Sequence, residues 1–315
     1  MMNSAELSVV LVNKYGFDRL RRVIAALSEQ SIADRLELVI VSPFDATNED
    51  PSPFAAVRYV KCGPIHSLGP LRAAGVLACS APFLVFGEDH CFPRPGWAGA
   101  LLSRLREGWM GVGPLVLNHN PSSWVSRADY LLNYGSWFQA RNGGPVRDIP
   151  PHNSAYPTAV LQALGRELPE LLQMDHHLQF KLRCRGGRLF LEPAAQVAHT
   201  NVSRGLVLCK SQFSGARIYG ATRAAYHRWT ALRRGFYAAV FPAIGVLRLI
   251  RACALLPDWR ALPVVPLLTL ASMMAATGEA CGYLFGSGSA LLYRVDDELD
   301  RASCLIDADR HLLFL

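Results

Sequence analysis

Charged residues are scarce in this sequence: they make up 18% of the 315 residues, whereas 51% are apolar. A disordered protein has the opposite balance, so the composition excludes that class. The sequence also has no internal repeat and no low-complexity segment. Its length exceeds that of a usual single domain, and we therefore expect one large domain with an appendage.

Paired cysteines are missing as well. The eight cysteines are scattered without any CxxC spacing, which argues against a zinc ribbon and a disulfide framework. The opening residues MMNSAELSVV lack the charged and apolar regions of a signal peptide, so we expect none. We accordingly expect the catalytic part to lie in a reducing cytoplasm.

Acidic residues are nearly absent from one part of the chain. From Arg204 to Arg260 there are ten Lys or Arg but a single acid, Asp258, and the whole chain has a net charge of +7. A basic stretch beside an apolar one favours an anionic membrane surface or a phosphate-rich substrate. Because no RNA- or DNA-binding motif is present, we expect no nucleic-acid partner.

Strand and helix patterns alternate in the first third of the chain. The segment from Asp18 to Gln30 has the apolar spacing of a helix, with Asp18 as its N-cap, and Pro70–Cys79 is a second helix. Apolar, β-branched runs predict four strands, at Ser8–Val12, Leu36–Val41, Val57–Lys61 and Phe83–Phe86. This alternation predicts an α/β domain with a mainly parallel sheet flanked by helices.

Polar side chains follow the fourth predicted strand. Ligands of such sheets bind at the carboxyl ends of the strands, and this strand ends in Glu88, Asp89 and His90. Two carboxylates suit Mg²⁺ or Mn²⁺, and an imidazole shifts the preference towards Mn²⁺ or a softer metal. The segment therefore predicts a divalent-cation site, with a solvated strand end as the alternative.

Three further residues have two interpretations each. Asp175 begins a predicted helix and is either its N-cap or a catalytic base. Arg72 lies on the helix before the fourth strand and is either a phosphate ligand or a surface arginine. His199 follows an apolar run, and it gains a role at the metal only if it converges on the Glu88–His90 corner.

The C-terminal part is strongly apolar. Phe236–Ile250 is interrupted by Arg248, whereas Leu262–Phe285 is long enough to cross a bilayer, which takes roughly 20 residues. Glu279 lies inside the second segment. These features predict two helices that lie in or dip through a membrane, and the alternative is a buried helical pair.

Taken in order, five segments resemble the family 2 glycosyltransferases, and the likeness covers residues 7–202. Ser8–Tyr15 is similar to the family's nucleotide-binding strand and turn, and Leu71–Gly75 to its arginine-bearing helix. Phe86–Trp97 is similar to the DxD metal motif, Met174–Gly187 to the base motif, and Arg188–His199 to the strand with a metal-side histidine. The resemblance implies a GT-A type fold, with a mixed, mainly parallel sheet flanked by helices and with apolar C-terminal helices.

The resemblance also implies an activity. A sugar would pass from a nucleotide-sugar donor to a lipid-linked or saccharide acceptor with inversion, and Asp175 would be the general base. Mn²⁺ or Mg²⁺ would be held by Glu88, His90 and His199. The residues that the resemblance places at the nucleotide are Val12, Asn13, Ser42, Arg72, Glu88 and Asp89.

Five residues depart from the family's pattern. Ser42 stands where the family usually has an aspartate for the nucleotide base, and Val12-Asn13 stands where proline and threonine are common. His90 replaces a metal-binding carboxylate, and Met174 replaces the acidic neighbour of the base. One alternative is therefore a catalytically inactive membrane scaffold of the same fold. Another is a metal-dependent hydrolase that uses Glu88, Asp89, His90, His176, His177 and His199.

These patterns divide the chain into four predicted parts. Residues 1–203 form the GT-A domain, 204–235 a basic helical connector, 236–293 an apolar membrane-associating hairpin, and 294–315 a C-terminal tail. Basic residues beside the first apolar segment favour the cytoplasmic side. We thus expect the protein at the cytoplasmic face of a bacterial membrane, with the membrane as one of its partners.

Overall fold

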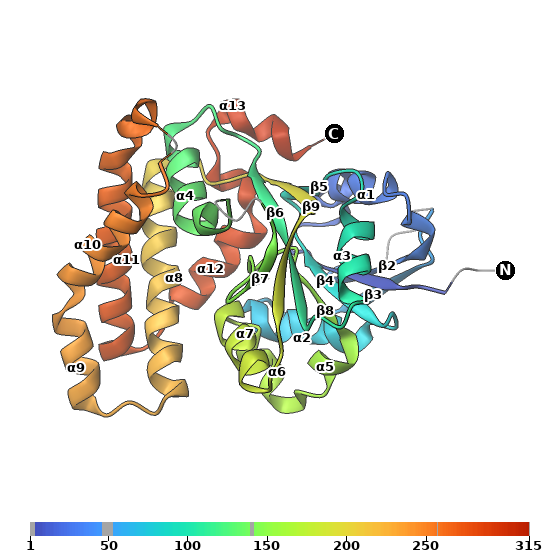
Figure 1. The fold of residues 1–315 in the computed structure, drawn as a ribbon, viewed down its shortest axis with the longest axis horizontal. Coiled ribbons are helices and arrows are strands. Elements are labelled where there is room, and N and C mark those ends of the chain that lie inside the picture. The colour runs from blue at the N-terminus through green and yellow to red at the C-terminus, as the bar shows by residue number, and fades with distance from the viewer. Residues whose placement is uncertain (1–3, 46–52, 139–141, 257, 315) are drawn as a thin grey trace. The chain divides into compact units, whose positions relative to one another are not determined.

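The computed structural model describes residues 4–45, 53–138, 142–256 and 258–314. The chain forms two compact units (Figure 1). The first unit consists of residues 1–119, 137–200 and 311–315, and the second consists of residues 120–136 and 201–310. The predicted parts do not map onto the two units one to one, because 120–136 belongs to the second unit and 204–235 lies within it.

A mixed sheet forms the centre of the first unit. In the described residues its order is β3-β2-β1-β4-β8-β6-β9-β5, and β7 pairs with β9. The strands are β1 Leu7–Val12, β2 Leu36–Ser42, β3 Ala56–Lys61, β4 Phe83–Gly87, β5 Cys91–Pro93, β6 Gly111–Asn118, β7 Gly144–Val146, β8 Ala155–Pro157 and β9 Leu189–His199. The first four are parallel to one another, as are β6 and β9, whereas β8 runs antiparallel to both of its neighbours.

Helices pack on this sheet. Helices α2, α5, α6 and α7 share one hydrophobic core with β1, β2 and β4, while α1 packs against β5 and α3 against β6 and β9. Their bounds are α1 Arg21–Ser28, α2 Leu68–Ala78, α3 Trp97–Leu105, α5 Thr158–Gln162, α6 Leu168–Leu171 and α7 Asp175–Cys184. The predicted α/β fold with a mixed sheet flanked by helices is confirmed.

Close packing places α2 directly over the sheet. A Cβ atom on Gly75 would lie 2.4 Å from a methyl carbon of Val10 in β1, so only glycine permits this approach. Helix α2 carries Arg72, and the glycine contact therefore fixes the distance of Arg72 from the strands.

One predicted helix start is wrong. Helix α1 begins at Arg21, and Asp18 lies in the preceding 3-10 turn rather than at the N-cap. The Asp18 carboxylate instead accepts a hydrogen bond from the Nε of Arg21 at 2.8 Å.

The regular elements in the described residues of the second unit are helices. They are α4 Trp124–Phe138, which continues two residues into the first unit, α8 Gly205–Tyr226, α9 Ala231–Ala239, α10 Phe241–Cys253, α11 Val265–Phe285, α12 Ala290–Leu299 and α13 Asp307–Arg310, with short 3-10 turns. By length and composition, Ala261–Phe285 is the single described helix that could cross a membrane, and α9 with α10 forms a bent apolar pair at 55°. The two predicted apolar segments therefore correspond to α9–α10 and α11.

The C-terminal tail belongs to the first unit. The guanidinium of Arg22 in α1 donates hydrogen bonds to the carbonyl oxygens of His311, Leu312 and Phe314, at 3.3, 2.6 and 3.3 Å. The guanidinium of Arg19 lies over the ring of Phe314 at 5.0 Å. These contacts anchor the tail beside α1.

Candidate active site

The pairing of β5 with β9 brings two distant segments together. After β4 ends, Glu88–His90 form a turn, and β5 then runs antiparallel to the end of β9 with Cys91 opposite His199. The carbonyl of His90 accepts a hydrogen bond from the amide of Thr200 at 3.0 Å. His199 therefore converges on the Glu88–His90 corner, which was the condition for its role at a metal.

Glu88, His90 and His199 form a compact group of candidate metal ligands. The Oε2 atom of Glu88 lies 3.6 Å from Nε2 of His90 and 3.8 Å from Nε2 of His199. The two imidazole rings meet edge to face with centroids 5.0 Å apart. The three ligand atoms lie within 4.8 Å of one another, and all three side chains are buried. Nitrogen and oxygen atoms in this arrangement could hold a divalent cation.

The charge of the Glu88 carboxylate is stabilised by its surroundings. Burial alone would raise the pKa of Glu88, but the neighbouring His152, His90 and His199 hold this pKa well below its ordinary value. Its Oε2 atom is one of the buried oxygens that have no hydrogen-bond partner among the described residues. A buried, ionised oxygen that faces two imidazole nitrogens fits a cation site.

Asp89 orients His90. The carboxylate of Asp89 lies 2.8 Å from Nδ1 of His90. The Nδ1 edge of the ring therefore faces Asp89, and its Nε2 edge faces Glu88. Asp89 therefore acts on the ring of His90 and not on the group of ligand atoms itself.

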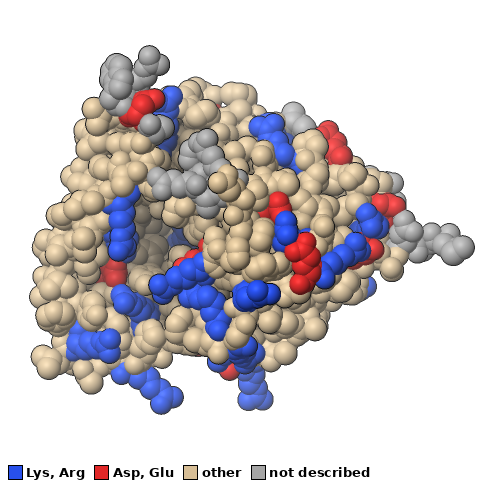
Figure 2. Space-filling model, in the orientation of Figure 1, with Lys and Arg blue, Asp and Glu red and all other residues tan. Residues whose placement is uncertain are grey.

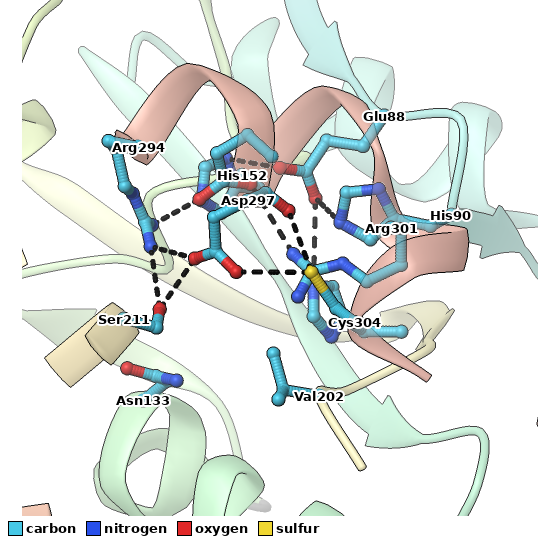
Figure 3. Close-up of polar contacts among 12 residues, drawn as sticks. Glu88, His90, Asn133, His152, Val202, Ser211, Arg294, Asp297, Arg301 and Cys304 are labelled. Carbon is cyan, nitrogen blue, oxygen red and sulfur yellow. Dashed lines mark hydrogen bonds and ion pairs between the residues drawn. The ribbon is translucent and has the colours of Figure 1, made fainter. Parts of the chain in front are cut away.

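His152 is the residue of this site that the sequence analysis missed. It lies in the segment before β8, and its Nδ1 is 2.8 Å from Oε1 of Glu88 (Figure 3). The same Nδ1 is 3.1 Å from Nη2 of Arg72. The Nδ1 atom cannot donate to Glu88 and accept from Arg72 at the same time. The charge of the carboxylate favours Nδ1–H donating to Glu88. The amide of Asn153 donates to the carbonyl of Phe86 in β4 at 2.8 Å, which holds the segment in place.

Arg72 and Asp175 form a buried pair. Nη1 of Arg72 lies 3.3 Å from Oδ2 of Asp175, and less than a tenth of either side chain is exposed. Arg72 is therefore not a surface arginine. Asp175 is the first residue of α7 and makes no capping hydrogen bond, since the N-cap position is Met174. Its Oδ1 atom is buried without a hydrogen-bond partner among the described residues.

The residues predicted at the nucleotide lie at the carboxyl ends of β1 and β2. Leu11 pairs with Gly87, so Val12 is next to the Glu88 turn in register. Asn13 donates from its side chain to the carbonyl of Gly16 at 2.6 Å, and the Ser42 hydroxyl accepts from the amide of Phe44 at 3.2 Å. Both side chains thus shape the turns that follow their strands.

The vicinal histidines of the hydrolase alternative occupy a different place. Both lie on α7, where His177 is buried and His176 is exposed. Among the described residues, neither belongs to the group of ligand atoms formed by Glu88, His90 and His199.

Comparison with known proteins gives no assignment. No protein-family model and no curated protein matches this sequence.

Proposed function

We propose that this protein is a GT-A type glycosyltransferase that moves a sugar from a nucleotide-sugar donor with the help of a divalent cation. The observation that carries the proposal is the convergence of two groups. Glu88, His90 and His199 form the cation site, and the Arg72–Asp175 pair reaches it through His152. Transfer from a nucleoside diphosphate needs both a cation and a base.

The cation site would serve the leaving group. A divalent cation bound by Glu88, His90 and His199 would neutralise the charge that develops on the departing diphosphate. Two of the three ligands are imidazoles, which favours Mn²⁺ over Mg²⁺ because magnesium prefers oxygen ligands. Arg72 would add a fixed positive charge on the same side of the site.

Asp175 would act on the acceptor. Its Oδ1 atom takes the proton of the acceptor hydroxyl while that oxygen forms a bond to the anomeric carbon and the bond from this carbon to the diphosphate breaks. Arg72 holds Oδ2, so the carboxylate keeps one orientation. A single displacement of this kind inverts the configuration at the anomeric carbon.

The second unit would attach the protein to a membrane. Its apolar helices and the nearly acid-free stretch from Arg204 to Arg260 support association with the cytoplasmic face, where a lipid-linked acceptor would be available. A saccharide acceptor is compatible with the same site.

A metal-dependent hydrolase is the second candidate. Two histidines and one glutamate also form the ligand set of hydrolytic zinc enzymes, in which a bound water occupies the open position. Incubation with nucleotide sugars in the presence and absence of acceptors separates the two activities. A hydrolase releases free sugar whether or not an acceptor is present.

The first test is calorimetric binding of UDP, GDP and dTDP, with CMP as a control, with and without Mn²⁺. Metal-dependent binding of one diphosphate supports the proposal. Failure of every nucleotide to bind in either condition contradicts it and favours the inactive scaffold.

The role of Asp175 is tested by Asp175→Asn. We expect transfer to fall at least about a thousandfold, because the base is lost, while nucleotide binding stays within a few-fold. Asp18→Asn, an exposed aspartate in the same unit, is the matched control and should keep full turnover. Unchanged turnover in Asp175→Asn would show that another group is the base.

A further inference from the structure

Helices α9 and α10 expose a continuous apolar stripe. Its large members, which we call the α9–α10 stripe, are Leu232, Phe236, Val246, Leu247 and Ile250, each exposed by half or more and Leu232 by 85%. Exposed alanines at 239 and 243 fill the interval between Phe236 and Val246, so the spacing stays at three or four residues across the bend. Within each of the two helices, such a spacing places the side chains on one face.

This stripe is not packed against the rest of the second unit. Apolar surface of this kind marks a site of interaction with a membrane or another protein. In Figure 2 the region of α9, α10 and α11 is mostly uncharged, with basic groups scattered over it.

The charges around the stripe favour an anionic partner. The exposed side chains of Arg228, Arg233 and Arg251 lie on or next to α9 and α10, and the sequence contains no Asp or Glu between Arg204 and Leu256. A second copy of this chain would set arginines against arginines if the same faces met. An anionic lipid surface covers the apolar side chains and neutralises the arginines together.

An aromatic cluster holds α9 in place behind the stripe. The ring of Trp229 stacks on Tyr237 with centroids 4.6 Å apart and lies 5.3 Å from the ring of Tyr283 in α11. The guanidinium groups of Arg223 and Arg233 lie over Trp229 at 5.0 and 4.5 Å. Trp229 and Tyr283 are buried, so this cluster fixes α9 against α11 and leaves the stripe on the outer side.

Helix α11 is less suited to lipid than its composition suggests. It packs along α8 with the backbones in contact, since a Cβ atom on Gly278 or Gly282 would lie 2.1 Å from a carbonyl oxygen of α8. Helix α8 carries Lys210, Arg217 and Arg223, so a bilayer around α11 would also have to accept those cations. The apolar residues of α11 are therefore better explained by packing within the second unit.

We propose that the α9–α10 stripe lies in the plane of an anionic bilayer surface and that no helix of the second unit spans the membrane. Leu232 and Phe236 enter the boundary between headgroups and acyl chains, and Arg228, Arg233 and Arg251 contact lipid phosphates. This inference rests on the proposed membrane association, and it specifies the surface and the lipid charge.

The test is sedimentation of the full chain with vesicles. We expect binding to vesicles of phosphatidylcholine and phosphatidylglycerol in equal amounts, weaker binding to phosphatidylcholine alone, and a decline as salt is added. The double substitution Leu232→Glu with Phe236→Glu should weaken binding at least about tenfold, because two exposed apolar side chains that enter the lipid are replaced by anions. Leu206→Glu, an equally exposed leucine at the start of α8, is the matched control and should bind as the unchanged protein does.

Several outcomes would overturn the proposal. These are equal vesicle binding by the double variant, no binding by the unchanged protein, and retention on vesicles through both high salt and alkaline wash, which indicates a spanning helix. A dimer in solution that the double substitution dissociates, without vesicle binding, would identify a second copy as the occupant.

If circular dichroism shows that the double variant does not fold, the single substitution Ile250→Glu provides the same test. Nucleotide binding by the same variants is measured in solution, without vesicles. This measurement tells a failure of the membrane proposal apart from a failure of the proposed transferase function.

Discussion

At the residue scale, the candidate site depends on the carboxylate of Glu88. One of its oxygens is the acceptor for His152, and the other faces His90 and His199 without a hydrogen bond. This division gives the histidines different roles. His90 and His199 would be ligands of the cation, whereas His152 would position the carboxylate.

The two roles can be separated by substitution. We expect His199→Ala to abolish Mn²⁺ binding measured by calorimetry, because it removes a ligand. His152→Ala should weaken binding by roughly 10- to 100-fold, the usual cost of losing a partner of a metal ligand. His66→Ala, a histidine outside this group, is the control. Complete loss of Mn²⁺ binding in His152→Ala would mean that His152 is itself a ligand.

At the scale of single elements, sequence patterns locate the longer strands but not the short ones. Strands β1 to β4 are runs of apolar, β-branched residues, and each lies within one residue of its predicted start and end. Strands β5, β7 and β8 have only three residues each, too few to show a period. They form because β4 and β9 offer edges for pairing, a property of the assembled sheet.

The residues of the candidate site also fall into those that sequence patterns locate and those that they do not. The Glu88–His90 turn follows a predicted strand, and β9 continues from its predicted start to His199, so these residues could be named in advance. His152 follows two prolines and carries no period or motif. It reaches Glu88 only because β8 pairs antiparallel with β4. A single sequence has no local signal for such a contact.

The packing of α8 on α11 depends on glycine. A Cβ atom on Gly282 would lie 2.1 Å from the carbonyl oxygen of Arg217, and backbone atoms cannot rotate away. Gly282→Ala should therefore lower the free energy of unfolding by about 1–3 kcal/mol in denaturant titrations. Gly215→Ala is the matched control on α8, because a Cβ atom there meets nothing within 4 Å. We expect it to be neutral or stabilising, and equal effects of the two substitutions would contradict the close approach.

At the scale of the whole molecule, each unit is assembled from separated parts of the chain. The second unit takes residues 120–136 from the middle of the first, and Val202 of its later part donates its amide to the carboxylate of Asp129 at 3.1 Å. In the same unit, Asp297 accepts a hydrogen bond from Ser211 and contacts the thiol of Cys304 (Figure 3). Buried polar contacts thus join the segments of the second unit.

Asp129 makes the stability of the molecule depend on pH. Burial raises its pKa to about 6, against the lowering effect of Arg301 and with the raising effect of Asp297. Because the folded pKa exceeds the ordinary value, this group's contribution to stability is complete below pH 4 and is lost as the pH rises through 6.

Asp129→Asn should remove this dependence. The amide side chain of the variant keeps an oxygen that accepts a hydrogen bond from the backbone amide of Val202. The exposed side chain of Asn133, which donates to Asp129, can rotate to present its oxygen to the new amide nitrogen. We expect the variant to be more stable than the unchanged protein by about 1–3 kcal/mol at pH 7.5 and similar to it at pH 4. Denaturant titration at both values is the measurement, and Asp307→Asn, an exposed aspartate of the same unit, is the control. Equal stability differences at both pH values would contradict the raised pKa.

The tail that Arg22 holds beside α1 has a consequence for biosynthesis. Residues 311–314 belong to the first unit, yet the ribosome makes them only after residues 201–310. The first unit therefore receives its last segment when the second unit is already synthesised. The second unit can be complete before residues 311–314 emerge, so the unit that contains the first strands of the chain is the last to receive all of its residues.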